Sequence, residues 1–383
     1  MTRDLRLLYA YRIVSRLYFH LPVLLVFFLL EDFSIFAAEV LLAVYGLAVT
    51  VGSALAPRLR GGLPRKWLVA GGEVLKLVGL LLVVATGEVW AAAIGQAVNG
   101  LGYAITQMTD ASLLAAVAPS KEANARAQSG TQSYMFLAVL VAGVVGAVMF
   151  DADRESVFYA SMGAALLSAL IAAAVREPRE EPAAAGGAAA ARGVGDLTPD
   201  EAWWVRYYVT LRAVTLAVFV GFLPYLFFVI IEVSLAWFGV VLGIFSLAAF
   251  LGARYAVGLM DRFGKPPLTL ATLLLSIGSM AVFATEPPLG VALVAMLLFG
   301  LSAGGVRPLT MSGLGGRRGE LVPAMERRFG LVNAAILVAG GALLDGTDDF
   351  QTLMIVLTVA YATALAAFLV RPSGVPVLRE VRR

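Results

Sequence analysis

The stretch that spans residues 236–285 reads AWFGVVLGIFSLAAFLGARYAVGLMDRFGKPPLTLATLLLSIGSMAVFAT. Two long apolar runs, 236–257 and 266–285, enclose a short connection that carries Arg262 and Lys265. A run of about 20 largely apolar residues is long enough to cross a lipid bilayer as an α-helix. This stretch therefore predicts two transmembrane helices that are joined by a cationic loop.

The same pattern extends over the whole chain of 383 residues. It predicts an all-α membrane protein with about twelve transmembrane helices. We expect these helices near residues 9–30, 36–57, 66–86, 89–117, 128–150, 156–175, 205–230, 236–257, 266–285, 289–313, 329–346 and 350–370.

The connections between these segments alternate in charge. Nearly all Lys and Arg residues outside the segments fall into every second connection, whereas the other connections are mainly acidic. Cytoplasmic loops of membrane proteins are enriched in Lys and Arg. The alternation therefore predicts a multi-pass protein of the cytoplasmic membrane with both termini in the cytoplasm. The basic connections include Arg58, Arg60, Arg65 and Lys66 after the second segment, and Arg317, Arg318, Arg327 and Arg328 after the tenth.

Composition excludes several other classes of protein. Hydrophobic residues make up 60% of the chain and charged residues 14%, about half of the charged fraction of a soluble domain. The absence of cysteine excludes a disulfide scaffold, a thiolate metal site and a Cys nucleophile. The basic residues are spread over short loops and form no nucleic-acid-binding patch. We expect no cofactor, no bound metal and no nucleic acid partner.

The central part of the chain divides it into two halves. Residues 177–204 are polar or rich in Ala and Gly, and we expect them to form a cytoplasmic linker. This predicts an N-terminal six-helix bundle over 1–176, and a C-terminal six-helix bundle with a cytoplasmic tail over 205–383. The halves also resemble each other at an offset of about 200 residues, as Gly100 and Gly300 illustrate, which predicts two pseudo-symmetric bundles.

The connection from Gly258 to Lys265, which contains Asp261, Arg262 and Gly264, resembles the Asp-Arg-x-Gly-Arg/Lys loop signature of the major facilitator superfamily. The twelve predicted helices, the two halves and the long central loop extend this resemblance over essentially the whole chain. In that family, the Asp and Arg of this loop lock neighbouring helix ends in the outward-facing state. The resemblance therefore implies that Asp261 and Arg262 are gate residues.

The chain also departs from the family pattern. In the first half, Pro57 stands where the family has its Asp, so we expect an altered gate lock there. Gln96 stands before Gly100 where drug/proton antiporters of the family place an Arg. The chain thus resembles the superfamily without resembling its drug/proton antiporter branch.

Three ionisable residues fall within the first predicted helix. An ionisable side chain at membrane depth carries a penalty of about 2.5–3.5 kcal/mol, so its presence needs a reason. Arg12, Arg16 and His20 lie at positions i, i+4 and i+8, which would place them on one face. We expect Arg12 to snorkel to the interface and Arg16 to lie deeper. His20, the single histidine, is either a hydrogen-bonded packing residue or a group that exchanges protons near neutral pH.

Two acids lie inside the third and fourth predicted helices. Glu73 and Lys76 are three residues apart and can pair across one turn, either as a self-neutralising pair or as a pair that a substrate or proton breaks. Asp110 lies at a similar depth in the fourth helix. Because desolvation disfavours the charged form of a buried carboxylate, we expect Glu73 and Asp110 to couple transport to protons.

The second half contributes Arg212 and Arg307 within its predicted helices. Arg307 precedes Pro308, and it could bind an anionic substrate group in bidentate fashion or pair with Asp110 or Glu73. Cations outnumber acids among these residues, which favours an organic anion or zwitterion as the substrate. The predicted substrate-binding residues are Arg16, His20, Lys76, Arg212 and Arg307.

These features predict a secondary active transporter that works by alternating access. No nucleotide-binding loop is present, so we expect an ion gradient, most simply of protons, to drive transport. We expect a monomer in the lipid bilayer that exports a small-molecule substrate as an antiporter, because short-loop members of the family are often exporters. Uptake symport, uniport and a non-transporting sensor role remain alternatives. An intramembrane enzyme is disfavoured, since the chain has no cysteine, one histidine and no metal-ligand spacing.

Overall fold

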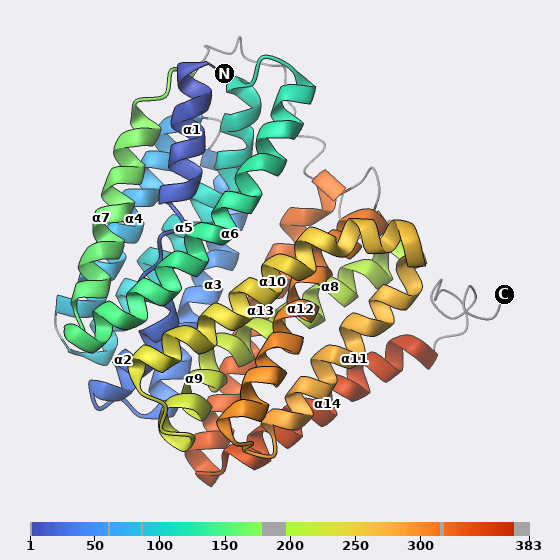
Figure 1. The fold of residues 1–383 in the computed structure, drawn as a ribbon. Coiled ribbons are helices and arrows are strands. Elements are labelled where there is room, and N and C mark those ends of the chain that lie inside the picture. Colours follow the sequence, from blue (N-terminus) through green and yellow to red (C-terminus); the bar gives the residue numbers. More distant parts are fainter. Residues whose placement is uncertain (1, 60–61, 86, 178–196, 315–317, 371–383) are drawn as a thin grey trace. The chain divides into compact units, whose positions relative to one another are not determined.

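The computed structural model describes residues 2–59, 62–85, 87–177, 197–314 and 318–370, and this part of the chain contains helices and their connections but no strand. Figure 1 shows the arrangement. The chain divides into two compact units. The N-terminal unit consists of Met1–Ala184 with Leu235–Gly239, and the C-terminal unit of Ala185–Ser234 with Val240–Arg383.

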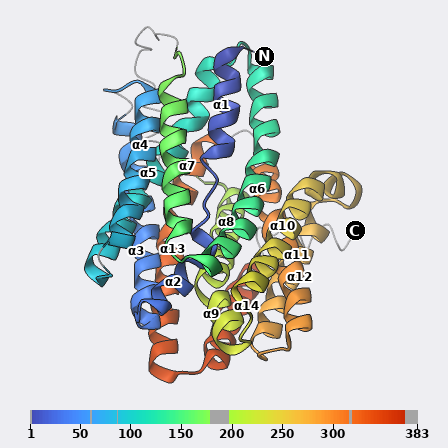
Figure 2. The ribbon, with the colours of Figure 1, turned by 60° about the vertical axis from the view of Figure 1, so that its left-hand side comes forward.

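The helices of the N-terminal unit match the predicted spans to within about two residues at each end, with two exceptions. The first span is broken, and the fifth helix begins at Lys121, before its predicted start at residue 128. In both views α1 lies beside α6 and α7, with which it is in contact (Figures 1 and 2). The elements are α1 (Arg3–Val14), the 3-10 turn η1 (Leu21–Val23), α2 (Leu24–Leu30), α3 (Ile35–Leu59), α4 (Arg65–Ala85), α5 (Val89–Val117), α6 (Lys121–Ala152) and α7 (Ser156–Ala173).

The C-terminal unit follows the same order of spans. Its first span continues from α8 through two π-helical turns, η4 and η5, that flank the short α9. The elements are α8 (Pro199–Ala217), η4 (Val218–Phe222), α9 (Leu223–Tyr225), η5 (Leu226–Ile230), α10 (Leu235–Phe263), α11 (Lys265–Phe283), α12 (Leu289–Leu314), α13 (Arg318–Thr347) and α14 (Phe350–Val370). Most of the predicted linker, residues 178–196, lies outside the described residues.

By length and composition, eight segments of the described chain are suited to cross a membrane. A further predicted span corresponds to α5, whose apolar character is lowered by buried Gln96, Asn99 and Asp110. The prediction of an all-α membrane protein with about twelve transmembrane helices in two pseudo-symmetric bundles is confirmed. Three shorter apolar helices occupy the other predicted spans: Leu21–Leu30, Leu137–Ala152 and Phe350–Ala366.

The same close helix contact through a glycine occurs in each of the two units. A Cβ atom at Gly100 would lie 2.5 Å from the Tyr45 carbonyl oxygen, and one at Gly300 would lie 2.5 Å from the Phe245 carbonyl oxygen. The second contact repeats the first at an offset of 200 residues. In each unit, the contact joins the second span to the fourth. The repeat that the sequence predicted from Gly100 and Gly300 is therefore present in the packing of the helices.

Candidate functional site

The first predicted span is broken in its middle. Helix α1 ends at Val14, and the next helical turn begins at Leu21. Pro22 contributes to the break, because a proline lacks a backbone N–H and its ring clashes with the carbonyl four residues earlier, here that of Tyr18. Residues 15–20, called the unwound segment below, connect the two helical parts.

Two predictions about this span are wrong. Arg12, Arg16 and His20 do not share one helical face, because the helix ends before the second of them. Arg12 does not snorkel either, since it is 6% exposed and its Nε donates to Asp110 Oδ2 at 3.0 Å. Its Nη1 donates to Thr131 Oγ1 at 2.7 Å. Arg12 therefore ties α1 to α5 and α6 through a buried ion pair, and breaking such a pair destabilises a protein by about 3–5 kcal/mol.

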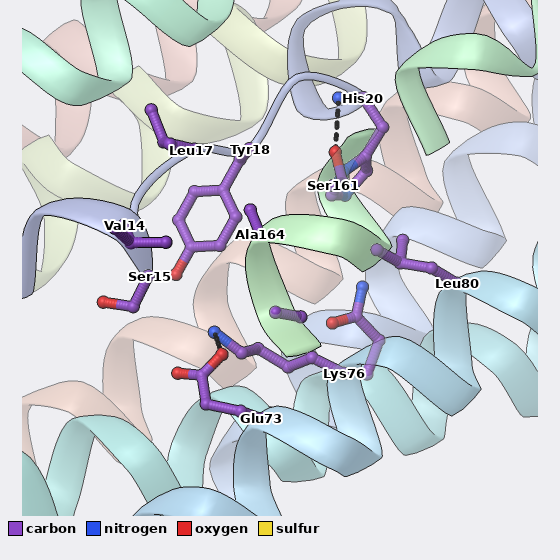
Figure 3. A pocket seen from close by; sticks show the side chains of 12 residues that line it. Val14, Ser15, Leu17, Tyr18, His20, Glu73, Lys76, Leu80, Ser161 and Ala164 are labelled. Atoms are coloured by element: carbon purple, nitrogen blue, oxygen red, sulfur yellow. Dashed lines mark hydrogen bonds and ion pairs between the residues drawn. The ribbon is translucent and has the colours of Figure 1, made fainter. Parts of the chain in front are cut away.

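A second buried ion pair faces the unwound segment. Lys76 Nζ lies 2.5 Å from Glu73 Oε2, which confirms the predicted pair within α4. The Tyr11 hydroxyl donates to Glu73 Oε1 at 3.0 Å. Figure 3 shows Tyr18 pointing from the unwound segment towards Lys76 and Glu73, and Lys76 Nζ lies 5.3 Å from the centre of the Tyr18 ring. The break in the first span thus places an aromatic ring beside this pair.

Arg16 is the cation of the unwound segment. Its Nη1 donates to the Tyr18 hydroxyl at 3.3 Å, and its guanidinium lies 5.9 Å from the centre of the Tyr103 ring. Its Nε atom is buried without a hydrogen-bond partner in the described part of the chain. Arg12 and Lys76 each have a carboxylate partner, whereas no described acid forms an ion pair with Arg16. Among the described residues of the N-terminal unit, Arg16 is therefore a half-buried cation without an acid at ion-pair distance.

His20 is held against α7. Its backbone N–H donates to Ser161 Oγ at 3.2 Å, and its ring Nδ1 lies 2.9 Å from the same oxygen. The Ser161 hydroxyl also lies 2.7 Å from the Val157 carbonyl oxygen. The imidazole ring stacks on Phe158 with 5.7 Å between the ring centres.

A small cavity lies beside the unwound segment (Figure 3). Its volume is about 20 Å³, which is enough for one water molecule but not for an organic solute. In the described conformation, this cavity can place water next to the buried ion pair. The polar residues that line it are Ser15, Tyr18, His20, Glu73, Lys76 and Asn99.

The C-terminal unit holds a charged cluster of its own. Arg212 of α8 forms an ion pair with Glu326 of α13, and its Nη1 also donates to the Tyr208 hydroxyl. Tyr208 in turn donates to Glu326 Oε1 at 2.8 Å. The Arg212 guanidinium lies 4.3 Å from the centre of the Phe329 ring. Arg307 lies in α12 of the same unit and is exposed.

The predicted substrate-binding residues therefore fall into two groups, Arg16, His20 and Lys76 in one unit and Arg212 and Arg307 in the other. The predicted proton-coupling acids, Glu73 and Asp110, both have cationic partners within the N-terminal unit.

The two predicted gate residues are part of a helix and not of a loop. Helix α10 runs through Asp261 and Arg262 and ends at Phe263. The end is set by Gly264, whose φ of +82° is a conformation that other residues rarely adopt. Both predicted gate residues are exposed, and the Arg262 guanidinium lies 5.2 Å from the centre of the Phe263 ring. Within the described residues, neither of them forms an ion pair.

Glu39, an acid inside the second apolar run, is a buried residue that was not predicted as a site residue. Glu39 is 0% exposed, and neither of its carboxylate oxygens has a hydrogen-bond partner among the described residues. Its position within α3 was the available signal, since an acid at membrane depth needs a reason. In the described part of the chain, no three His, Cys, Asp or Glu side chains gather closely enough to bind a metal ion.

The family model described as Major Facilitator Superfamily matches residues 14–317. No curated protein matches the chain. The fold is similar to three solved transporters at low sequence identity. The nucleoside transporter NupG aligns with a TM-score of 0.78 and 13% identity, covering 96% of this chain and 98% of that one.

A bacterial homologue of the iron transporter ferroportin, in an inward-facing state, aligns with a TM-score of 0.73 and 17% identity over 96% of this chain and 98% of that one. A D-xylose-proton symporter aligns with a TM-score of 0.70 and 17% identity over 94% and 95%. At these identities, the likeness establishes the fold, and the solutes named for these proteins differ from one another.

Proposed function

The chain belongs to the major facilitator superfamily, and on that premise we propose that it is a proton-coupled exporter of a small organic anion or zwitterion. The two bundles expose a binding site alternately to the two sides of the membrane. We place the chain as a monomer in the cytoplasmic membrane, with both termini in the cytoplasm.

The proposed class of substrate rests on the surroundings of Arg16. Its guanidinium has a buried Nε without a partner, and no described acid balances its charge by an ion pair. A cation at membrane depth is stabilised by an opposite charge, which a carboxylate or phosphate group of a substrate can supply. In the C-terminal unit, the positive charges of Arg212 and Arg307 both act on the same acid, Glu326. Both units thus favour an anionic group.

Counterflow in proteoliposomes tests this assignment with a panel of anionic, zwitterionic and cationic metabolites. We expect uptake of labelled anions or zwitterions, and we expect Arg16→Gln to weaken their apparent affinity about tenfold or more, the value of a charged hydrogen bond. Arg3→Gln is the control, because Arg3 is an exposed arginine of α1, the helix that precedes the unwound segment. Counterflow of cations alone would contradict the choice of substrate, and no counterflow of any solute would favour the sensor alternative.

Proton coupling is assigned to Glu73 and Asp110, with the cavity beside Glu73 as a place for water. In the described state each carboxylate is held by a cation, Lys76 or Arg12. A rearrangement that separates one of these pairs leaves a buried carboxylate, which then favours its protonated form. The ion pairs therefore make proton uptake depend on the conformation of the bundle.

Glu73→Gln and Asp110→Asn should abolish accumulation driven by a pH gradient and spare exchange of substrate for substrate, which moves no net proton. Asp151→Asn is a control, because Asp151 is an exposed acid of the same unit. If the double variant still accumulates substrate under a pH gradient, these two acids are excluded. His20 and Glu39 then become the candidates to replace.

The orientation can be tested with single cysteines, because the chain has none of its own. Asp200→Cys and Asp345→Cys place a thiol at exposed positions near opposite ends of the C-terminal unit. In sealed right-side-out vesicles, we expect a membrane-impermeant maleimide to label the cysteine at 345 and not the one at 200. The reverse labelling pattern would contradict cytoplasmic termini. In a separate measurement, loading the vesicles with substrate and following its movement distinguishes export from uptake.

A further inference from the structure

A groove lies on the C-terminal unit between α8 and α13, apart from the charged cluster of Arg212. Its volume is about 230 Å³. The groove has an apolar wall and a cationic rim. Val205 and Val209 of α8 and Leu331 and Val332 of α13 form the wall, and Arg206 and Arg328 form the rim.

Arg206 lies in the first half of α8, and Arg328 lies in the first turns of the apolar span of α13. Arg206 follows the first residue of α8, Pro199, by seven positions, which corresponds to about 10 Å along the helix. Arg328 follows Ala324, where the apolar span of α13 begins, by four positions. Arginine side chains at this depth extend their guanidinium to the membrane surface and keep their methylenes in the apolar layer. The rim thus reaches the level of lipid headgroups.

The rim charges are available to a ligand. Arg206 and Arg328 are exposed, and neither forms a hydrogen bond or ion pair with any described side chain. Two acids of these helices are engaged elsewhere: Glu201 accepts hydrogen bonds from Thr198, and Glu326 is held by Arg212 and Tyr208.

The apolar wall is open as well, with Leu331 52% exposed and Val332 37% exposed. Two cations above an apolar wall complement a phosphodiester that carries acyl chains. None of the described residues that line the groove is an acid that could pair with the ammonium of a zwitterionic headgroup.

We propose that this groove binds an anionic phospholipid. The phosphate group contacts Arg206 and Arg328, and one acyl chain lies along Val205, Val209 and the α13 side chains. With the termini in the cytoplasm, the lipid belongs to the cytoplasmic leaflet. The site lies outside the charged clusters assigned to transport, so it exists whether or not the proposed substrate is correct.

Native mass spectrometry of the full chain in neutral detergent tests the site with phosphatidylglycerol, phosphatidylcholine and inorganic phosphate. We expect tighter binding of phosphatidylglycerol than of phosphatidylcholine. Arg206→Gln with Arg328→Gln should weaken phosphatidylglycerol binding about 25-fold, at about fivefold for each arginine, and leave phosphatidylcholine unchanged. Arg254→Gln is the matched control, because Arg254 is an exposed arginine of α10 and should have no effect.

Unchanged phosphatidylglycerol binding in the double glutamine variant would overturn the proposal. Full competition by inorganic phosphate would also overturn it, since the site would then take a free anion. If the glutamine variant does not fold, Arg206→Lys with Arg328→Lys keeps both charges. This variant should retain lipid selectivity to within about threefold, the difference between a point charge and a forked donor. Loss of selectivity in the lysine variant would contradict a site that depends on charge.

Discussion

The first spans of the two units have corresponding residues but differ in the backbone conformation around a proline. Arg12 and Arg212 are 200 residues apart, and the pair Leu21-Pro22 corresponds to Leu223-Pro224. In the N-terminal unit, the chain leaves the helix over residues 15–20. In the C-terminal unit it stays helical and widens into two π-helical turns, one on each side of the proline.

The difference shows that one local problem has two tertiary solutions. A proline removes a donor and displaces the preceding turn, and the freed groups need other partners. In the N-terminal unit, Ser161 supplies one partner to His20, and Gly146 of α6 lets the Phe19 carbonyl come close. A Cβ at Gly146 would lie 2.2 Å from that oxygen, whereas Gly346, its counterpart 200 residues later, has nothing within 4 Å.

The largest expected difference is in the stability that the protein loses when each of the two arginines is replaced. Arg12→Ala leaves Asp110 buried and unpaired, and we expect a loss of about 3–5 kcal/mol in the free energy of unfolding. Arg212→Ala should lose about 1 kcal/mol, because the Arg212 side chain is 33% exposed and solvent screens its pair with Glu326. Thermal unfolding in detergent measures both.

The double variant Arg12→Leu with Asp110→Leu is the control for the buried pair. It should recover most of the loss, since removing both charges leaves no unpaired ion. Equal losses from Arg12→Ala and Arg212→Ala would show that the two pairs are equivalent, and would break the comparison.

Replacing the two glycines by alanine should change the stability of the protein by different but smaller amounts. Gly146→Ala forces α6 away from the unwound segment, and we expect a destabilisation of about 1–3 kcal/mol. Gly346→Ala meets no atom and should be neutral or slightly stabilising, because alanine favours the helix. The same unfolding assay decides this, and a destabilisation by Gly346→Ala as large as that by Gly146→Ala would contradict it.

The two prolines should differ in backbone protection. Pro22→Ala restores an N–H and removes a clash, so we expect amide hydrogen exchange over residues 16–21 to slow about tenfold. Pro224→Ala should leave the exchange of its segment unchanged, because that chain is already helical. If exchange over residues 16–21 does not change, Ser161 and Gly146 rather than Pro22 hold the segment unwound.

The sequence predicted what depends on neighbouring residues. The span boundaries followed from apolar runs, and the pair of Glu73 and Lys76 followed from their spacing of three residues. The repeat was visible at Gly100 and Gly300, because close helix contacts need a small residue at a fixed place. These features require no knowledge of which helices meet.

The sequence did not predict what depends on distant partners. Arg12 and Asp110 are 98 positions apart, and nothing in either segment indicates that α1 and α5 bring them together. The break before Pro22 could have been predicted from the proline, but the choice between unwinding and a π-helical turn depends on Gly146 and Ser161 from other helices. Glu39 was hidden within an apolar run that otherwise fits a span.

The smallest expected effect on stability concerns Asp261, since both predicted gate residues are exposed and form no ion pair within the described residues. The N-terminal half has Pro57 at the corresponding position, so any lock based on this acid belongs to the C-terminal half alone. Asp261→Asn should leave the free energy of unfolding within about 0.5 kcal/mol of the parent chain, as for other surface changes.

Turnover in proteoliposomes should nevertheless fall about two- to fivefold in this variant, the range that an exposed charge pair can supply when it forms in one transport state and not in the other. Substrate affinity measured from the accessible side should change less than turnover, because Asp261 lies outside both charged clusters. Asp200→Asn, another exposed acid of the C-terminal unit, is the control and should leave turnover unchanged. An unchanged turnover in Asp261→Asn would remove the gate role from this helix end, and an equal loss in Asp200→Asn would assign the effect to surface charge in general.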